Sequence, residues 1–131
     1  MKKIYIGCSL SHSTEEFRNS IDALKAALRE KYEVLEFFGL GAGEPQAVFK
    51  KDYGQVKSCD LLLAECSHPS TGLGVEVGLA ISLNKPILAI AQPNSTVSRM
   101  ITGIDHPKFN FLRYTSIDEV IKAVEEKIST I

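Results

Sequence analysis

Two patterns of hydrophobic residues alternate along this 131-residue chain. One is a short continuous apolar run, such as LLLAEC at positions 61–66, which is typical of a strand buried on both faces of a sheet. The other is a longer stretch with an apolar residue every three or four positions. Between Thr14 and Lys31, Phe17, Ile21 and Leu24 fall on one stripe of a helix, and Thr14 is placed to cap it.

Strand-like and helix-like stretches follow one another five times along the chain. This order predicts an α/β fold, a parallel sheet with helices packed on both faces. No repeat, linker or low-complexity tract interrupts it, so we expect a single domain over residues 1–131. The expected strands are Lys3–Cys8, Tyr32–Phe38, Asp60–Cys66, Lys85–Ala91 and Lys108–Tyr114, and the expected helices are Thr14–Lys31, Gln46–Cys59, Gly74–Asn84, Thr96–Ile104 and Ser116–Thr130.

Polar or glycine-rich segments follow four of the expected strands. In parallel α/β sheets, ligands bind beyond the carboxyl ends of the strands, near the point where the strand order reverses. We therefore expect the functional cleft at this edge of the sheet. The segments are CSLSHS at 8–13, FFGLGAG at 37–43, CSHPSTGLGVE at 66–76 and QPNST at 92–96.

Glu76 is the charged residue that stands out in these segments, because it follows a strand and a glycine-rich turn and is expected in the first turn of a helix. Free amides and the helix dipole favour an ionised carboxylate there, and such helix-start acids are common without any function. Gly72 and Gly74 change the interpretation, because they let the backbone pass close to a ligand, and Ser70 adds a hydroxyl. An ionised carboxylate at the mouth of a cleft can act as a nucleophile or stabilise a cation.

The other candidate residues are ambiguous by themselves. Ser9, Ser11 and Ser13 directly precede a helix, where hydroxyls and amides suit a phosphate, although serines equally fill loops and cap helices. Asp52 by itself is most simply one more charge on a solvated helix face. Phe38 and its neighbour are either core residues or a platform for a stacked base. The chain lacks both the dinucleotide fingerprint and the phosphate-loop motif that would decide the matter.

Composition narrows the range of partners. The net charge is -1 and the sequence pI is about 6.3, which argues against a nucleic-acid polymer or an anionic membrane as partner. No apolar run is long enough for a membrane span, and no segment resembles a signal peptide. Three sparse cysteines suggest a reduced, cytoplasmic chain. The Cys8–His12 and Cys66–His68 spacings match no zinc pattern, so we expect neither a metal nor a cofactor.

Residues 59–90, CDLLLAECSHPSTGLGVEVGLAISLNKPILAI, carry a motif of the form E-x-x-x-P-S-x-G-x-G-x-E-x-G-x-A that begins at Glu65 and is followed by K-P-I-L. This segment resembles the core of the nucleoside 2-deoxyribosyltransferase family, and most closely its 2'-deoxynucleoside 5'-phosphate N-hydrolases. The resemblance extends over nearly the whole chain. It implies a flavodoxin-like, three-layer fold with a five-stranded parallel sheet, and cleavage of the bond between deoxyribose and base.

The resemblance also implies a role for individual residues. Glu76 would be the nucleophile that attacks the anomeric carbon, Asp52 would protonate the base or activate water, and Tyr5 would orient the nucleophile. Ser98 would come from a neighbouring subunit, so a homodimer with a shared active site is implied, with a deoxynucleoside 5'-monophosphate as substrate. The residues expected to bind that substrate, with Ser9 and Ser70 on its phosphate, are Gly7, Cys8, Ser9, Leu10, Ser11, Phe38, Ser70, Gly72, Gly74, Ser98 and Met100.

Three positions depart from the hydrolase pattern. Ser11 stands where those enzymes carry an arginine, Val75 where an aromatic residue is frequent, and Phe38 where a histidine is found. Two other functions remain open. One is a transferase that exchanges bases on deoxyribose, and the other is a non-catalytic nucleotide- or flavin-binding module, because this fold hosts many functions. A binding module has no need of Glu76 and Asp52 side by side.

Overall fold

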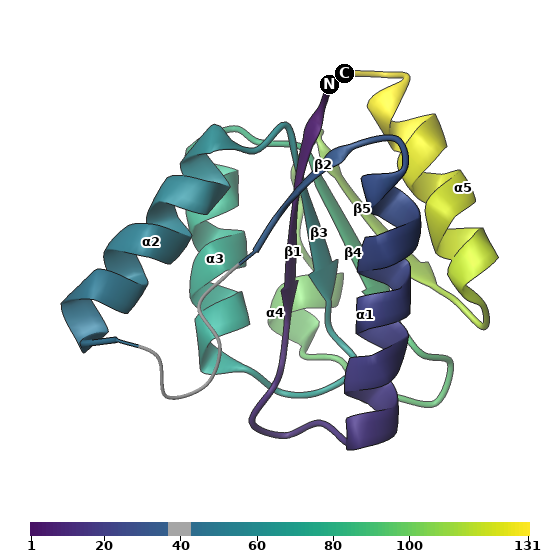
Figure 1. Ribbon diagram of the computed structural model, residues 1–131, viewed down its shortest axis with the longest axis horizontal. Coiled ribbons are helices and arrows are strands. Elements are labelled where there is room, and N and C mark those ends of the chain that lie inside the picture. Colours follow the sequence, from purple (N-terminus) through teal and green to yellow (C-terminus); the bar gives the residue numbers. More distant parts are fainter. Residues whose placement is uncertain (37–42) are drawn as a thin grey trace.

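The computed structural model describes residues 1–36 and 43–131, in which strands and helices alternate along the chain (Figure 1). Each predicted element is present, with shifts at its ends. The strands are β1 (Lys3–Cys8), β2 (Glu33–Leu35), β3 (Leu61–Glu65), β4 (Ile87–Ala91) and β5 (Phe109–Arg113), and the helices are α1 (Glu15–Arg29), α2 (Pro45–Ser58), α3 (Thr71–Ser82), α4 (Arg99–Thr102) and α5 (Ile117–Ile128).

The five strands form one parallel sheet in the order β2-β1-β3-β4-β5, which confirms the predicted fold class. The strand order reverses between β1 and β3, where Tyr5 pairs with Leu62 and Gly7 with Ala64. The carboxyl ends of β1 and β3 point to the lower edge of the sheet in Figure 1, where α1 and α3 begin. The expected cleft therefore lies at this switch point.

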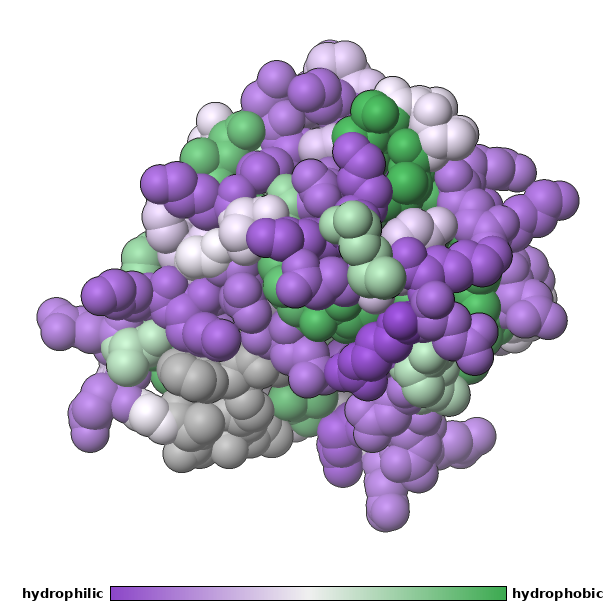
Figure 2. Space-filling view, turned by 45° about the horizontal axis from the view of Figure 1, so that its top comes forward, coloured by the Kyte–Doolittle hydropathy of each residue, from purple (hydrophilic) through white to green (hydrophobic). Residues whose placement is uncertain are grey.

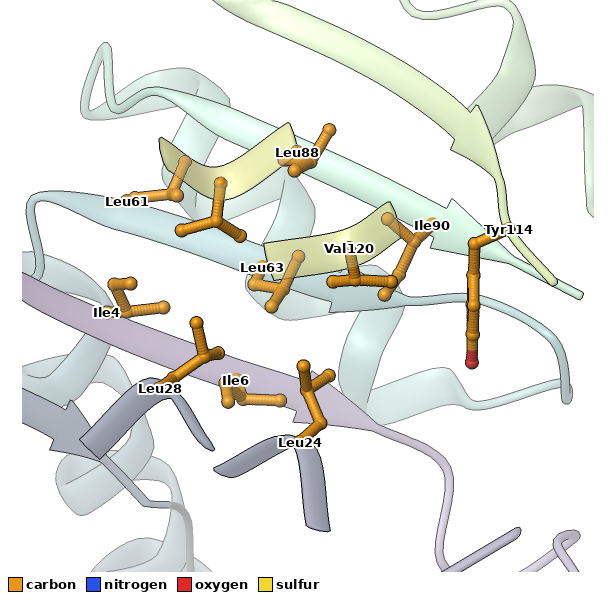
Figure 3. Packing of buried hydrophobic residues seen from close by; sticks show 11 residues of the cluster. Ile4, Ile6, Leu24, Leu28, Leu61, Leu63, Leu88, Ile90, Tyr114 and Val120 are labelled. Atoms are coloured by element: carbon orange, nitrogen blue, oxygen red, sulfur yellow. The ribbon is translucent and has the colours of Figure 1, made fainter. Parts of the chain in front are cut away.

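The central strands bury side chains on both faces, as their continuous apolar runs predict. One face holds Ile4, Ile6 and Leu63 against α1 and α5 (Figure 3). The opposite face holds Tyr5 and Leu62 against α2 and α3. Because successive side chains of a strand point to opposite faces, odd-numbered β1 residues face α3 and even-numbered ones face α1. Residues at the end of β1 are divided between two sides of the sheet by the same rule.

The largest differences from the predicted boundaries are at α3, β2 and α4. Helix α3 begins at Thr71 rather than Gly74, because the Ser70 hydroxyl accepts a hydrogen bond from the Leu73 amide at 3.1 Å and caps the helix earlier. Gly72 and Gly74 therefore lie inside the helix and not in a turn before it. Strand β2 spans only Glu33–Leu35 at the sheet edge. Helix α4 is shorter than predicted and ends at Thr102, before Gly103, where a Cβ would lie 2.8 Å from the Arg99 carbonyl oxygen.

Hydrophilic residues cover most of the face shown in Figure 2, and hydrophobic residues appear there in separate patches. Among the helices of the described residues, none is long and apolar enough to cross a membrane.

Candidate active site

A buried contact between β1 and α3 forms the centre of the candidate site. Tyr5 is fully buried, and its hydroxyl donates a hydrogen bond to Oε2 of Glu76. Gly7, two residues further along the same face of β1, provides the space for this carboxylate. A Cβ at position 7 would lie 3.0 Å from Oε1 of Glu76 and 2.7 Å from Cδ1 of Leu73. Strand β1 and helix α3 thus hold the carboxylate of Glu76 between the Tyr5 hydroxyl and the backbone of Gly7.

Glu76 is the sixth residue of α3, one turn beyond the free amides at the helix start. Burial raises the pKa of Glu76 to about 7, the Tyr5 hydrogen bond opposes that rise, and the charge of Asp52 adds to it. The prediction that the helix start keeps Glu76 charged is therefore wrong. The group that favours its ionised form is the Tyr5 hydroxyl, on a strand far away in the sequence.

Asp52 lies on α2, half-buried, and close enough to Tyr5 and Glu76 that its charge raises the pKa of both. The raised pKa of Tyr5 is due first to burial and then to Glu76, so its phenol stays protonated and remains a donor. Helices α2 and α3 pack against each other on this side of the sheet. The structure therefore brings together all three residues predicted to be catalytic.

The loop after β1 carries several of the predicted substrate-binding residues. Ser9 is only 2% exposed, and its hydroxyl accepts a hydrogen bond from the His12 amide at 3.4 Å. The Ser13 hydroxyl donates to the Leu10 carbonyl at 3.2 Å. Ser11 is exposed to solvent. These internal bonds give the loop a definite shape, which a substrate group at this edge would meet.

Cys8 and Leu10 lie on the α1 side of the sheet, where they pack with Phe17 and Ile21. Burial raises the pKa of the Cys8 thiol to about 11, so it is protonated at neutral pH and is a poor nucleophile. The carboxylate of Glu76 is on the other side of β1. A substrate contact from Cys8 or Leu10 would therefore come from the α1 side of the sheet, and it stays a prediction.

The start of α3 lies at the same edge of the sheet as the loop after β1 and forms another side of the candidate site. The Ser70 hydroxyl accepts the capping bond from Leu73 and still has its own proton to donate. Gly72 and Gly74 are exposed, and a Cβ built at Gly74 meets no atom within 4 Å. The first turn of this helix is therefore open, as the prediction of a close approach to a ligand requires.

A buried acid, Glu65, to which the sequence analysis gave no role, supports the start of α3 from behind. Glu65 has no exposed surface and accepts hydrogen bonds from the Ser67 amide at 2.6 Å, the Ser67 hydroxyl at 2.9 Å and the Tyr114 hydroxyl. The Ser67 hydroxyl in turn accepts from the Gln92 amide at 2.8 Å. This network joins the ends of β3, β4 and β5 and fixes the segment that leads to Ser70. In the sequence Glu65 stands out as a carboxylate inside the apolar run LLLAE and as the first residue of the motif that contains Glu76.

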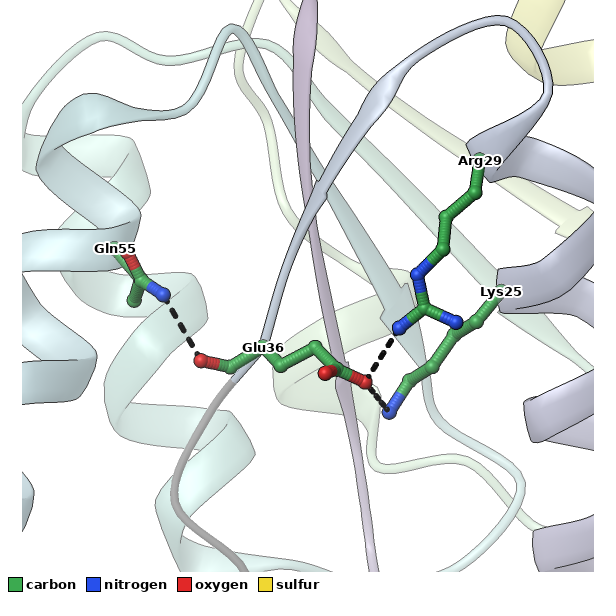
Figure 4. Close-up of polar contacts among 4 residues, drawn as sticks. All are labelled: Lys25, Arg29, Glu36 and Gln55. Atoms are coloured by element: carbon green, nitrogen blue, oxygen red, sulfur yellow. Dashed lines mark hydrogen bonds and ion pairs between the residues drawn. The ribbon is translucent and has the colours of Figure 1, made fainter.

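Glu36 fixes the end of β2, as Figure 4 shows. Its carboxylate pairs with Lys25 at 3.3 Å and with Arg29 at 2.9 Å, both from α1. Its carbonyl oxygen accepts a hydrogen bond from Gln55 of α2 at 2.9 Å. Phe38, a predicted binding residue, comes two positions after Glu36 and lies outside the described residues.

Ser98 and Met100 line an apolar groove of about 360 Å³ between α3 and residues 96–104, which Ser70 and Gly74 also line. Ser98 caps α4 by accepting a hydrogen bond from the Met100 amide at 3.1 Å, and Met100 is 84% exposed. Neither Glu76 nor Asp52 lines this groove. The substrate contacts of Ser98 and Met100 stay predictions, and the predicted role of Ser98 depends on a second subunit.

A metal site has little support in this arrangement. Within residues 1–36 and 43–131, no group of three or more histidine, cysteine, aspartate or glutamate side chains is placed to hold a metal ion. The thiols of Cys8 and Cys66 are buried and protonated at neutral pH, because burial raises the pKa of both. Proton transfer and nucleophilic attack are the chemistry that this cluster can perform by itself.

Comparisons with known sequences point in the same direction. The family Nucleoside 2-deoxyribosyltransferase matches residues 4–112. The chain is 33% identical over 103 residues to the 5-hydroxymethyl-dUMP N-hydrolase of Danio rerio, covering 76% of this chain and 71% of the relative. It is 34% identical over 86 residues to a Thermofilum pendens protein with the provisional name 2'-deoxynucleoside 5'-phosphate N-hydrolase 1. That match covers 64% of this chain, which spans only 60% of the relative's length.

Known structures share the fold. The CMP N-glycosidase of Clostridium botulinum superposes with a TM-score of 0.72 at 23% identity, covering 95% of this chain and 99% of that one. The 2-deoxyribosyltransferase of Bacillus psychrosaccharolyticus superposes with a TM-score of 0.67 at 22% identity, covering 90% and 89% of the two chains.

Proposed function

Because the chain belongs to the nucleoside 2-deoxyribosyltransferase family, we propose that it hydrolyses the N-glycosidic bond of 2'-deoxynucleoside 5'-monophosphates. The products would be the free base and 2-deoxyribose 5-phosphate. The observation that carries this proposal is the cluster of Tyr5, Asp52 and Glu76 beside the bare backbone of Gly7, at the switch point of the sheet.

In the first step, a carboxylate oxygen of Glu76 attacks the anomeric carbon of the deoxyribose. The bond from that carbon to the base nitrogen breaks, its electron pair leaves with the base, and Asp52 supplies the proton. In the second step, Asp52 takes a proton from water, whose oxygen displaces Glu76 from the sugar. This is the double displacement of retaining glycosidases, in which one carboxylate forms the covalent intermediate and another transfers protons.

The electrostatics of the cluster fit this division of roles. With a pKa near 7, Glu76 is partly ionised at neutral pH, and the Tyr5 hydroxyl stabilises the ionised form. A desolvated carboxylate is a better nucleophile than a hydrated one, since attack needs less solvent reorganisation. The charge of Asp52 disfavours ionisation of Glu76, in the same direction as burial. Nucleophilic attack removes the charge from Glu76 at the moment when Asp52 must donate.

The preference for a 5'-monophosphate is supported by the loops that flank the cluster. Ser9, Ser11 and Ser70 offer hydroxyls, and α1 and α3 both begin at this edge of the sheet, where free amides favour an anion. No acidic residue stands between Cys8 and Ser13 to repel a phosphate. A deoxynucleoside without the phosphate would lose these interactions.

Transfer of deoxyribose to a second base remains the competing activity, because the family is named for it and a transferase from it shares the fold. A non-catalytic module is less well supported, since it has no need of two neighbouring carboxylates and a buried tyrosine donor.

The decisive experiment is incubation of the protein with the four deoxynucleoside 5'-monophosphates and the matching nucleosides, followed by chromatography of the released base. We expect base release from monophosphates to be at least tenfold faster, because hydrogen bonds to a charged group contribute roughly 1.5–3 kcal/mol each. A parallel reaction with an added free purine detects base exchange. Rapid exchange with little net hydrolysis would establish the transferase instead, and no reaction in either assay would refute both activities.

We also propose that the active unit is a homodimer in which the groove beside α3 is covered by a second copy. Met100 is strongly exposed at its rim, and the open positions of Gly74 and Gly78 allow close approach of another backbone. Such a dimer would let Ser98 of one copy approach the cleft of the other, as the family resemblance implies.

A further inference from the structure

Arg18, on the first turns of α1, holds the loop that follows β1. Its Nη1 donates hydrogen bonds to the Ser13 carbonyl at 2.9 Å, the Leu10 carbonyl at 3.4 Å and the Ser13 hydroxyl at 3.5 Å. The Ser13 hydroxyl itself donates to the Leu10 carbonyl. One guanidinium nitrogen therefore ties together both ends of the segment that contains Ser11.

The acceptors of Arg18 are all neutral oxygens. In residues 1–36 and 43–131, no carboxylate lies within 4.0 Å of its nitrogens, whereas Lys25 and Arg29 on the same helix share the carboxylate of Glu36. Glu15, Asp22 and Glu36 do line the pocket of about 360 Å³ that Arg18 borders, but none of them forms an ion pair with it. Among the described residues, Arg18 thus has no ion-pair partner within 4.0 Å.

The position of this charge is unfavourable for the helix alone. Arg18 is the fourth residue of α1, near the positive end of the helix dipole, where a cation costs stability and the neighbouring Glu15 and Glu16 are the favoured type. Hydrogen bonds to two carbonyls offset part of this cost. An anion bound at the same edge of the sheet would offset the rest, since the guanidinium and the helix start would attract it together.

We infer that Arg18 is the positioning residue of the 5'-phosphate subsite. It shapes the loop that presents Ser9 and Ser11, and it supplies the positive charge that this loop lacks, because no lysine or arginine occurs between Cys8 and Thr14. This inference rests on the proposed function, in that the anion it names is the phosphate of that substrate.

Three variants test the inference. Arg18→Gln keeps amide donors but removes the charge, and Arg18→Lys keeps the charge with a different shape. Lys31→Gln is the matched control, because Lys31 lies at the other end of α1 and pairs with Glu125 on the surface. Melting temperatures establish that each variant is folded. The two measurements are calorimetric binding of 2-deoxyribose 5-phosphate, and KM and kcat for deoxynucleoside 5'-monophosphates and nucleosides.

We expect Arg18→Gln to raise the Kd for 2-deoxyribose 5-phosphate and the KM for monophosphates by about tenfold or more, with kcat within about threefold. Cleavage of nucleosides should be unchanged, which a general loss of structure would not produce. Arg18→Lys should recover most of the binding, and Lys31→Gln should behave as wild type. An unchanged Kd in folded Arg18→Gln, or an equal loss with Arg18→Lys, would overturn the inference. If wild type cleaves nothing, the proposed function fails, while the binding measurement still decides the role of Arg18.

Discussion

The hydroxyl of Tyr5 donates a hydrogen bond to the carboxylate of Glu76, a residue 71 positions later in the chain. This contact joins the strand at the centre of the sheet to the helix that carries the proposed nucleophile. It is the interaction that favours the ionised form of Glu76 against burial and against the nearby charge of Asp52. The activity of the proposed enzyme should therefore depend on pH through this pair.

Tyr5→Phe should shift the acidic limb of the pH–activity profile upward. The limb follows ionisation of Glu76, whose pKa of about 7 would rise when its donor is lost. A hydrogen bond to a charged group contributes roughly 1.5–3 kcal/mol, so the shift should be about one to two pH units. Tyr114→Phe is the matched control, since it removes a tyrosine–carboxylate bond to Glu65 away from the cluster. An unshifted limb in Tyr5→Phe would contradict the assigned role.

Glu76→Gln should abolish base release, with a loss of several orders of magnitude in kcat, because a neutral amide cannot form the glycosyl ester. The same variant should reveal the cost of the buried charge. In wild type the folded pKa lies above the ordinary value of 4.5, so its contribution to stability is present below pH 4.5 and is lost as the pH rises towards 7.

The free energy of unfolding of Glu76→Gln, measured by urea titration, should therefore gain about 3 kcal/mol over wild type between pH 4.5 and pH 7 and then level off. A difference that does not change with pH would show that Glu76 has an ordinary pKa.

Asp52→Asn should slow turnover while leaving KM nearly unchanged. Proton transfer by a positioned side chain typically contributes on the order of a hundredfold to ten-thousandfold in rate. Because the charge of Asp52 raises the pKa of Glu76, the variant should also move the acidic limb to lower pH, opposite to Tyr5→Phe. Asp118→Asn, an exposed acid in α5, serves as the control. Full activity in Asp52→Asn would remove it from the mechanism.

Gly7→Ala should reduce kcat without unfolding the protein. The added methyl would lie 2.7 Å from Cδ1 of Leu73 and 3.0 Å from Oε1 of Glu76, so both side chains must move. Displacement of the carboxylate by a fraction of an ångström is enough to slow a reaction that depends on alignment. Gly54→Ala on α2, where a Cβ meets nothing within 4 Å, is the control. Equal kcat values for the two variants would show that the position of Glu76 against β1 is unimportant.

Met100→Glu should weaken the proposed homodimer, because it places a charge on an exposed apolar side chain at the rim of the groove beside α3. Sedimentation at several concentrations should show a shift towards monomer, and activity per chain should fall in parallel if Ser98 acts in the partner's cleft. Exposed Val75→Glu tests whether any charge on α3 has the same effect. A fully active wild-type monomer at assay concentration would refute the shared site.

Much of the fold follows from local pattern. The continuous apolar runs of β3 and β4 predicted buried parallel strands, since only helices on both faces of a sheet can cover them. The cap at Thr14 was also predicted from the sequence, and its hydroxyl accepts a hydrogen bond from the Phe17 amide. The start of α3 was not predicted correctly. Gly72 and Gly74 suggested a turn before the helix, whereas in the folded protein the Ser70 hydroxyl caps the helix ahead of them.

The candidate residues of the site likewise came from the sequence, through the motif that contains Glu76, but their electrostatic state did not. The sequence predicted Glu76 in the first turn of a helix, where the helix dipole favours a carboxylate. The tertiary structure instead buries Glu76 near Asp52 and provides the Tyr5 hydroxyl as its hydrogen-bond donor. The sequence did not single out Arg18 at all, and it named Glu65 only as part of the motif, without its role in fixing the loop after β3. The physical reason is that desolvation and hydrogen bonding depend on groups distant in the chain, so only the packed structure decides which charges are favoured.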